Sequence, residues 1–566
     1  MRTKSSLYCG AAFGVMLAVG LGAAAQAKTS KKHHHHEAAP PAASAEEVKA
    51  LADEIESLKA RLDQEQVARE QTEAKAQAAQ AEAESAKADA QAAHSQLAEQ
   101  IQTLPGTINT AVAAAKPKTD KLYYKGISVT MGGFAAAETA YRSHDETADI
   151  GSSFAKMPFA NDKASHTSSE TFTGRQSRYS ALVQGDISSD IHAAFYGEFD
   201  FLGAAQTANS NESNSYQPRV RNLYGQVDWD QEGWHVLAGQ NWSLASMNTK
   251  GITPRSETPP PTIDAQYVPG FVWARQPQIR LTKDFNKELW IAISVENPQT
   301  TFGNVTTASG VSITNTQAPT SQFYNGTNYS LNNIPDVIGK VAFDNAFAGH
   351  ALHAELYGLL RNYMDRVQIA AGNASGYAAG VSNQTTSGGG VGGGVNFAVV
   401  PNMLDVTGSF LTGDGVGRYG SAQLPDVTAR PNGKLEGIRE TMWLAGATLH
   451  ATPALDVYVF GGEEAERSKT FGSVAAPGSA LFGYGTIAGS TNAGCVVEGG
   501  ACSAVTKSID QVSAGLWDKV YNGSFGQVRI GLQYSYTERK AFADAAGLAP
   551  KATENMVFTS FRYYPF

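Results

Sequence analysis

The segment VRIGLQYSYT, residues 528–537, alternates along its length between two kinds of side chain. Apolar and aromatic residues occupy one set of positions, and small or polar residues occupy the other, which is the pattern of a β-strand with two different faces. Residues 178–187 and 289–296 follow the same rule. In all three segments the polar face includes a charged residue, so the pattern suits a wall between lipid and water.

Similar strands recur from residue 124 to the end of the chain, about sixteen in all, and the links between them alternate between short and long. The strands begin near 125, 176, 192, 218, 234, 274, 288, 335, 350, 390, 403, 438, 454, 508, 524 and 553. The short links are Ser188–Asp190, Asp230–Gly233, Asp284–Lys287, Asn345–Gly349, Pro401–Asn402, Ala451–Pro453 and Tyr521–Gly523. The long links lie near 142–175, 203–217, 244–273, 298–334, 365–389, 413–437, 467–507 and 541–552.

This asymmetry predicts an all-β transmembrane barrel of about sixteen antiparallel strands, with its turns on one side of the outer membrane and its loops on the other. A soluble β-sandwich is the alternative, but it does not need connections of two kinds. An even number of strands returns both ends of the barrel to the periplasm.

The N-terminal part has a different composition. Residues 1–27 read as a signal peptide, with Arg2 and Lys4 before an apolar stretch and an Ala-Gln-Ala cleavage site at its end. An uncleaved membrane anchor is the alternative. Residues 28–44 form a basic, His-, Ala- and Pro-rich tract predicted to be disordered. Its four consecutive histidines, 33–36, fit either a solvated tract or a transition-metal ligand set, and we favour the tract.

Residues 45–104 predict a long helical coiled coil in the periplasm. Apolar residues recur there in steps of three and four, and the same phase continues in alanines. Because alanine side chains bury little apolar surface between helices, the coil is expected to form only if another part of the protein brings the helices together. A single solvated helix or a disordered tract is the alternative. Residues 105–122 form a linker, and the barrel occupies 123–566.

Several classes of function find no support in the sequence. The net charge of −9 argues against nucleic acid as a partner, and no catalytic motif, cofactor motif or metal-ligand set predicts an enzyme. The glycine run at 388–393 matches a dinucleotide-binding pattern formally, but no helix follows it, and a curved barrel strand explains it better. Cys495 and Cys502 predict a short extracytoplasmic disulfide.

Arginines recur near the outer ends of alternate strands, which would build a basic stripe at a constriction of the lumen. Alternation assigns Arg178 and Arg280 to the lumen. Arg219 and Arg221 share parity with apolar residues, so lipid headgroups are an equal alternative for them. The third long link, 244–273, is expected to fold inward. The predicted pore-lining residues are Arg178, Arg280, Arg219, Arg221, Arg275, Glu257, Asp264 and Tyr267.

Four short segments resemble DcaP-like outer-membrane porins: AGQNWSL at 238–244, ENPQ at 296–299, GDGVGRY at 413–419 and the terminal FRYYPF. The resemblance covers 45–566. It implies a homotrimeric, sixteen-stranded porin with a periplasmic stalk, through which small anionic solutes such as dicarboxylates diffuse. Its other expected partners are outer-membrane lipid, lipopolysaccharide and the barrel-assembly machinery, for which Tyr564 and Phe566 form the signal. The alternative function is an envelope protein that tethers the outer membrane to peptidoglycan through the coil.

Overall fold

The structure, a computed structural model, describes residues 121–203, 216–317 and 329–566, with scattered positions between Asp53 and Ala92. The predicted signal peptide, the tract 28–44, most of the coil 45–104 and nearly all of the linker 105–122 lie outside the described residues and stay predictions. Within the described part, no helix is long and apolar enough to cross a membrane.

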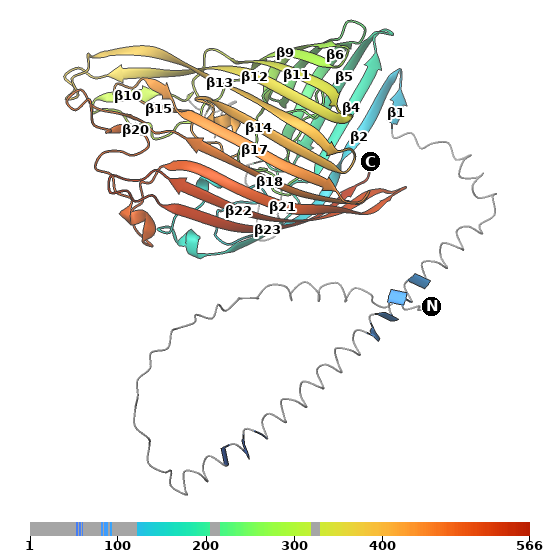
Figure 1. Ribbon diagram of the computed structural model, residues 1–566. Helices are drawn as coiled ribbons and strands as arrows, with labels where there is room; N and C mark the ends of the chain where they lie inside the picture. Colours follow the sequence, from blue (N-terminus) through green and yellow to red (C-terminus); the bar gives the residue numbers. More distant parts are fainter. Residues whose placement is uncertain are drawn as a thin grey trace, which may run out of the picture. The chain divides into compact units, whose positions relative to one another are not determined.

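Sixteen antiparallel strands form a closed barrel, as the sequence predicts (Figure 1). The last strand, β23, pairs with β22 on one side and with the first wall strand, β2, on the other, which closes the sheet. The wall strands are β2 (Ile127–Arg142), β4 (Arg178–Asp186), β5 (Ile191–Asp200), β6 (Arg219–Trp229), β7 (Trp234–Trp242), β8 (Arg275–Phe285), β9 (Leu289–Glu296), β11 (Asp336–Phe347), β12 (His350–Ile369), β13 (Gly380–Val400), β14 (Leu404–Asp414), β17 (Arg439–His450), β18 (Leu455–Glu466), β21 (Thr506–Gly523), β22 (Gly526–Ala541) and β23 (Lys551–Tyr564).

Short turns and long loops occupy opposite ends of the barrel. β2 begins, and β23 ends, at the end that carries the short turns, because Ile127 pairs with Gly185 and Tyr564 pairs with Gln527. The two ends of the barrel chain therefore lie together (Figure 1). A short strand precedes the wall, and the long loops hold further elements: β1 (Lys121–Tyr124), β3 (Ser169–Thr173), β10 (Val311–Thr314), β15 (Val427–Ala429), β16 (Leu435–Gly437), β19 (Lys469–Phe471), β20 (Phe482–Tyr484), and 3-10 turns η1 (Phe154–Lys156), η2 (Lys163–His166), η3 (Gly417–Tyr419) and η4 (Ala493–Val496).

The two faces of the wall differ as the alternation predicts. In β9, Ile293 is 51 % exposed on the outer face, whereas its neighbour Ser294 is 1 % exposed on the inner face. In β22, Leu532 and Tyr534 point outward and Gln533 is buried inside. Outward apolar side chains without protein neighbours suit contact with lipid chains.

Glycines 388–394 of β13 make room for side chains inside the barrel. A Cβ on Gly392 would lie 2.4 Å from the hydroxyl of Tyr357, and one on Gly394 would lie 2.6 Å from Sδ of Met247. Both distances are too short for a side chain. The run therefore belongs to a tightly packed wall strand and opens no helix, which agrees with the prediction.

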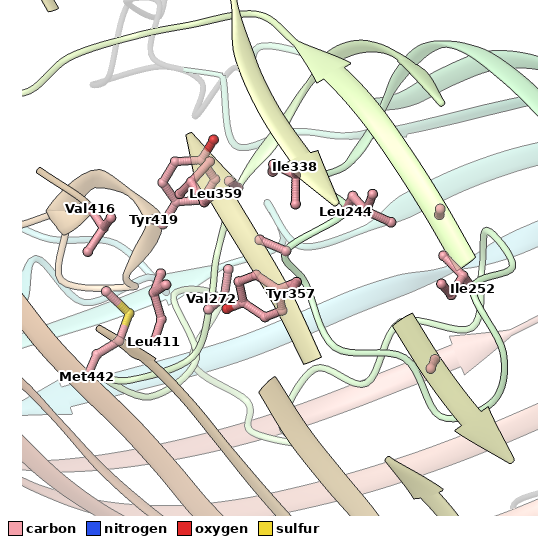
Figure 2. Packing of buried hydrophobic residues seen from close by; sticks show 14 of the residues in the cluster. Leu244, Ile252, Val272, Ile338, Tyr357, Leu359, Leu411, Val416, Tyr419 and Met442 are labelled. Atoms are coloured by element: carbon pink, nitrogen blue, oxygen red, sulfur yellow. The ribbon is translucent and has the colours of Figure 1, made fainter. Parts of the chain in front are cut away.

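Two long loops fold into the lumen and form an apolar core against the wall. We call residues 243–274 loop 3 and residues 415–438 loop 6. Figure 2 shows side chains of both loops packed against β11, β12, β14 and β17: Leu244, Ile252 and Val272 from loop 3, Val416 and Tyr419 from loop 6, and Ile338, Tyr357, Leu359, Leu411 and Met442 from the wall. The inward fold of the third long link is thus observed.

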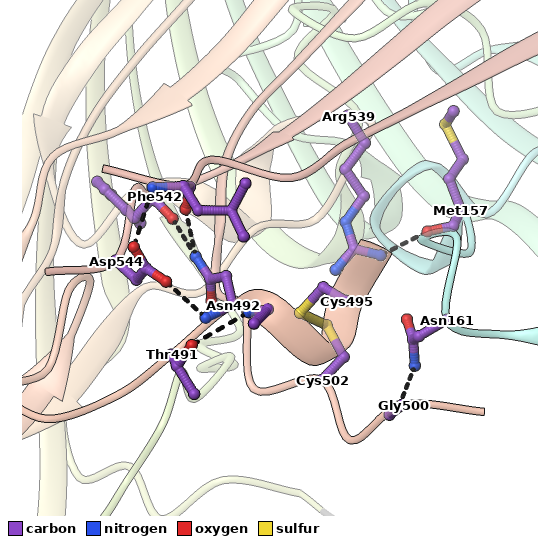
Figure 3. The surroundings of a disulfide bond; sticks show 12 residues. Met157, Asn161, Thr491, Asn492, Cys495, Gly500, Cys502, Arg539, Phe542 and Asp544 are labelled. Atoms are coloured by element: carbon purple, nitrogen blue, oxygen red, sulfur yellow. Dashed lines mark hydrogen bonds between the residues drawn. A yellow bond between two sulfur atoms is a disulfide. The ribbon is translucent and has the colours of Figure 1, made fainter. Parts of the chain in front are cut away.

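Cys495 and Cys502 form a disulfide, as predicted, in the long loop between β18 and β21 (Figure 3). The bridged segment is held to the loop between β2 and β4, because Nδ2 of Asn161 donates to the carbonyl of Gly500 over 3.2 Å. Asn492 ties it to the loop between β22 and β23. The disulfide therefore stabilises a surface where three loops meet.

Candidate functional site

Loop 3 crosses the lumen and binds the far wall. It leaves β7 at Ser243 and returns to β8 after Ala274. Between these points the indole Nε1 of Trp517, on β21, donates to the carbonyl of Pro261 over 2.7 Å. The backbone N–H of Gly270 donates to Glu464, on β18, over 2.8 Å. A loop that leaves one wall and is bound to the opposite wall divides the lumen, so it narrows any passage through it.

Two carboxylates on β5 gather three arginines beside this loop. Nε of Arg178 lies 3.3 Å from Glu198, and Arg221 pairs with Glu198 and, over 2.9 Å, with Asp200. Nη2 of Arg219 lies 2.7 Å from Asp200. Three guanidinium groups face two carboxylates, so the group keeps a positive charge.

A β-bulge turns two of these arginines inward. In β6, Asn222 and Val220 pair with consecutive residues of β5, which leaves Arg221 between them without a partner. The extra residue shifts the alternation of the strand. Arg219 and Arg221 therefore point into the barrel, although they share parity with Leu223, which is 39 % exposed on the outside. The structure places neither side chain among lipid headgroups.

Tyr267 brings loop 3 to these arginines. Its backbone has a φ of +68°, a conformation that residues other than glycine rarely adopt, and its ring lies 6.3 Å from that of Trp242. The guanidinium of Arg275 lies 4.9 Å from the Trp242 ring and 4.7 Å from the Trp273 ring. Burial raises the pKa of the Tyr267 phenol, but Arg221 and its neighbouring arginines outweigh burial and hold that pKa below its usual value. We call Arg178, Arg219, Arg221 and Arg275 the basic cluster.

Three of the predicted site residues lie elsewhere. Arg280 points into the lumen, but its Nη2 donates to the carbonyl of Trp242 over 2.7 Å. Burial raises the pKa of Glu257, and Arg280 opposes that shift from nearby. Asp264 accepts the backbone N–H of Ser152 over 3.0 Å, so it anchors the loop between β2 and β4. The sequence predicted that both carboxylates would face the arginines. Asp264 contacts Ser152 instead, because the first long loop also enters the lumen.

A second buried network was missed by the sequence analysis. Arg361 on β12 binds Asp426 of loop 6 over 2.6 Å and Asp336 of β11 over 3.2 Å. Arg418 and Tyr419, from the GDGVGRY segment, also bind Asp336, over 3.1 and 2.9 Å. The network fixes loop 6 to the wall. Alternation places Arg361 on the inner face, but only the fold shows which loop carboxylate it meets.

The chain is similar in structure to the outer membrane channel DcaP of Acinetobacter baumannii, with a TM-score of 0.52 and 16% identity over 78% of this chain and 99% of that chain. The chain has the fold of an outer-membrane porin. More distant are an anion-selective porin from Comamonas acidovorans (TM-score 0.39, 12% identity, 77% of this chain and 99% of that chain) and OmpF of Salmonella typhi (0.41, 9%, 78% and 99%). No protein-family model and no curated protein matches the chain.

The terminal aromatics of the porin-like barrel have different surroundings. Tyr564 and Phe558 face the interior, where Tyr564 meets Phe134 at 5.1 Å and Phe558 is fully buried. Phe566 lies two residues beyond the end of β23 and is 61 % exposed. Arg562, on the same face, pairs with Glu138 of β2 over 2.9 Å, so it helps to close the barrel. The role of these residues in assembly stays a prediction.

Within the described residues, no group of three or more His, Cys, Asp or Glu side chains is arranged to hold a metal ion. The carboxylate of Asp414, in the GDGVGRY segment, lies 3.3 Å from Nη1 of Arg439.

Proposed function

We propose that the chain is an outer-membrane porin through which small hydrophilic solutes diffuse passively, with a preference for anions such as dicarboxylates. The observation that carries this proposal is the position of Tyr267: loop 3 holds its ring 6.3 Å from that of Trp242, over which Arg275 of the basic cluster lies, inside a closed barrel. Rings or patches of charge at the narrowest point of a pore set its ionic preference.

The charge balance of the site supports the anionic part of the proposal. Glu198 and Asp200 neutralise two of the four arginines in the basic cluster, and the surplus positive charge remains where the loop narrows the lumen. The side chains of Arg178 and Arg219 keep 27 and 32 % of their surface exposed, so a solute can reach them. The anion selectivity named for the Comamonas porin agrees with this preference.

The proposal includes a homotrimer in the outer membrane with its coil in the periplasm. Lipid and lipopolysaccharide then surround the outer apolar face. Tethering to peptidoglycan depends on residues 28–104, and deletion of those residues separates the two functions. A porin keeps its conductance after that deletion, whereas a tether loses envelope integrity.

Swelling of liposomes that contain the purified protein tests the proposal. We expect swelling in a neutral sugar of low mass, faster swelling in a dicarboxylate of similar size, and slower swelling in an organic dication. Swelling no faster than that of empty liposomes would refute the porin. Equal rates for the dicarboxylate and the dication would refute only the preference for anions and would leave the porin function standing.

A further inference from the structure

Loop 3 begins with residues 244–251, which we call the arm. Backbone groups of the arm bind carboxylates of the inner wall. The arm runs past β9, β11 and β12 toward the end of the barrel that carries the short turns. Three backbone N–H groups of the arm donate to wall carboxylates: Leu244 to Glu296 over 2.8 Å, Asn248 to Glu355 over 3.2 Å and Gly251 to Asp344 over 2.8 Å. The position of the arm therefore depends on how these carboxylates are held.

His353 of β12 joins two of the three carboxylates. Its Nδ1 lies 2.8 Å from Asp344 and its Nε2 lies 3.1 Å from Glu355, and the residue is 3 % exposed. On the other side of Glu355, Nζ of Lys340 lies 2.8 Å away and also donates to the carbonyl of Ser246 in the arm, over 2.7 Å. Two cationic side chains and two carboxylates thus form one row beneath the arm, in which Lys340, His353 and Glu355 are buried and Asp344 borders a cavity.

The geometry around His353 needs a proton on both ring nitrogens. A neutral imidazole has one N–H donor and one lone pair, whereas both nitrogens here face a carboxylate oxygen. With the second proton, His353 and Lys340 balance Asp344 and Glu355. Without it, a lone pair faces a carboxylate, and the buried group has one uncompensated negative charge, which is unfavourable away from water.

Arg280 and Glu257 also interact with the Lys340–Glu355 pair, but their opposite charges offset each other. Asn396, the pairing partner of His353 on β13, donates to the carbonyl of Asn248 over 2.8 Å and so also holds the arm. A cavity of about 640 Å³ opens beside His353 toward the short turns and gives protons access. Besides Asp344 and His353, the charged and titratable groups around that cavity are Lys250, Lys287, Glu288, Asp405 and His450.

We propose that His353 is a positioning residue: its proton fastens the arm of loop 3 to the wall, and loss of that proton as pH rises releases the arm. The proposal rests on the proposed function in one respect, because loop 3 is taken to set the width of the passage. Release of the arm makes the passage wider and less ordered at pH values above the titration range of His353.

His192 provides a matched control. Its ring nitrogens lie 2.7 Å from Asp186 and 3.5 Å from Asp230, so it also bridges two carboxylates. These carboxylates belong to the wall strand β4 and the turn after β6, and no hydrogen bond of His192 reaches loop 3. Its titration is therefore expected to leave the arm unchanged.

A spin label on the arm tests the proposal in the purified full-length protein. Lys250 is exposed, so Lys250→Cys in a Cys9→Ser background offers a single reactive thiol besides the disulfide pair. We would record electron paramagnetic resonance spectra from about pH 5 to about pH 9, which spans the ordinary titration of histidine. In the Lys250→Cys protein, the ratio of mobile to immobile label should rise about tenfold with pH, because a charge-assisted hydrogen bond is lost.

His353→Gln should keep the label mobile at every pH, His353→Lys should keep it immobile, and His192→Gln should follow the parent protein. Heat-modifiable migration in gels confirms that each variant is folded. If the His353→Gln variant does not fold, the His353→Lys variant tests the proposal in its place. A label whose mobility does not change with pH in the parent protein would overturn the proposal, as would a His353→Gln variant that keeps the parent's profile. Bilayer recordings separate this from the proposed function, since a protein that never conducts refutes the porin whatever the label reports.

Discussion

The replacement Arg361→Ala should lower the free energy of unfolding of the barrel by about 3 kcal/mol, because it removes the cation that pairs with the buried Asp426 and one of the two that pair with Asp336. The Arg361 side chain is 1 % exposed, and those of its partners Asp336 and Asp426 are fully buried. Asp336 keeps Arg418 and Asp426 keeps backbone donors, so part of the stabilisation remains. Urea unfolding in lipid, followed by tryptophan fluorescence, measures the change.

Arg439→Ala is the control for this prediction. Its pair with Asp414 spans 3.3 Å, but the two side chains are 44 and 52 % exposed, so its loss should change the free energy of unfolding by about 0.5 kcal/mol or less. Equal effects of the two substitutions would contradict a buried network that holds loop 6 to the wall.

The double substitution Arg178→Gln with Arg275→Gln should abolish most of the proposed preference for anions. It removes two of the four charges of the basic cluster, while Arg219 and Arg221 still pair with the carboxylates of β5 and keep the site folded. The reversal potential in a potassium chloride gradient should shift toward the cation value, with at least a several-fold fall in the chloride-to-potassium permeability ratio.

Arg529→Gln is the matched control for charge loss. Arg529 lies on the inner face of β22, near the short turns, and stacks 4.8 Å from the ring of Tyr564. It lies outside the basic cluster, so its neutralisation should leave the permeability ratio close to that of the parent. A ratio unaffected by the double substitution would show that the basic cluster does not select ions.

The barrel could be predicted because its signals are local. The alternation in β9 and β22 and the lengths of the links depend only on neighbouring residues, and the sixteen wall strands begin close to the predicted positions, except β13, which begins at Gly380 instead of near 390. β13 begins earlier than predicted because its pairing with β12 continues to Gly380 and Ile369, so the hairpin extends into the predicted loop.

The site could be predicted only in part, because it depends on events that alternation does not record. A single bulge at Arg221 reverses the parity of the outer end of β6. Asp264 meets Ser152, and Arg361 meets Asp426, across more than sixty residues of chain in each case. Such contacts depend on which loops enter the lumen together, and a single sequence carries no signal for that.

The most direct measurement is the current through a Tyr267→Cys channel before and after a thiol reagent is added. On the proposed function, loop 3 holds position 267 in the solute path beside the basic cluster. An anionic methanethiosulfonate should therefore react faster than a cationic one, and its attachment should block most of the current. A thiol that reacts without any change in current would contradict the claim.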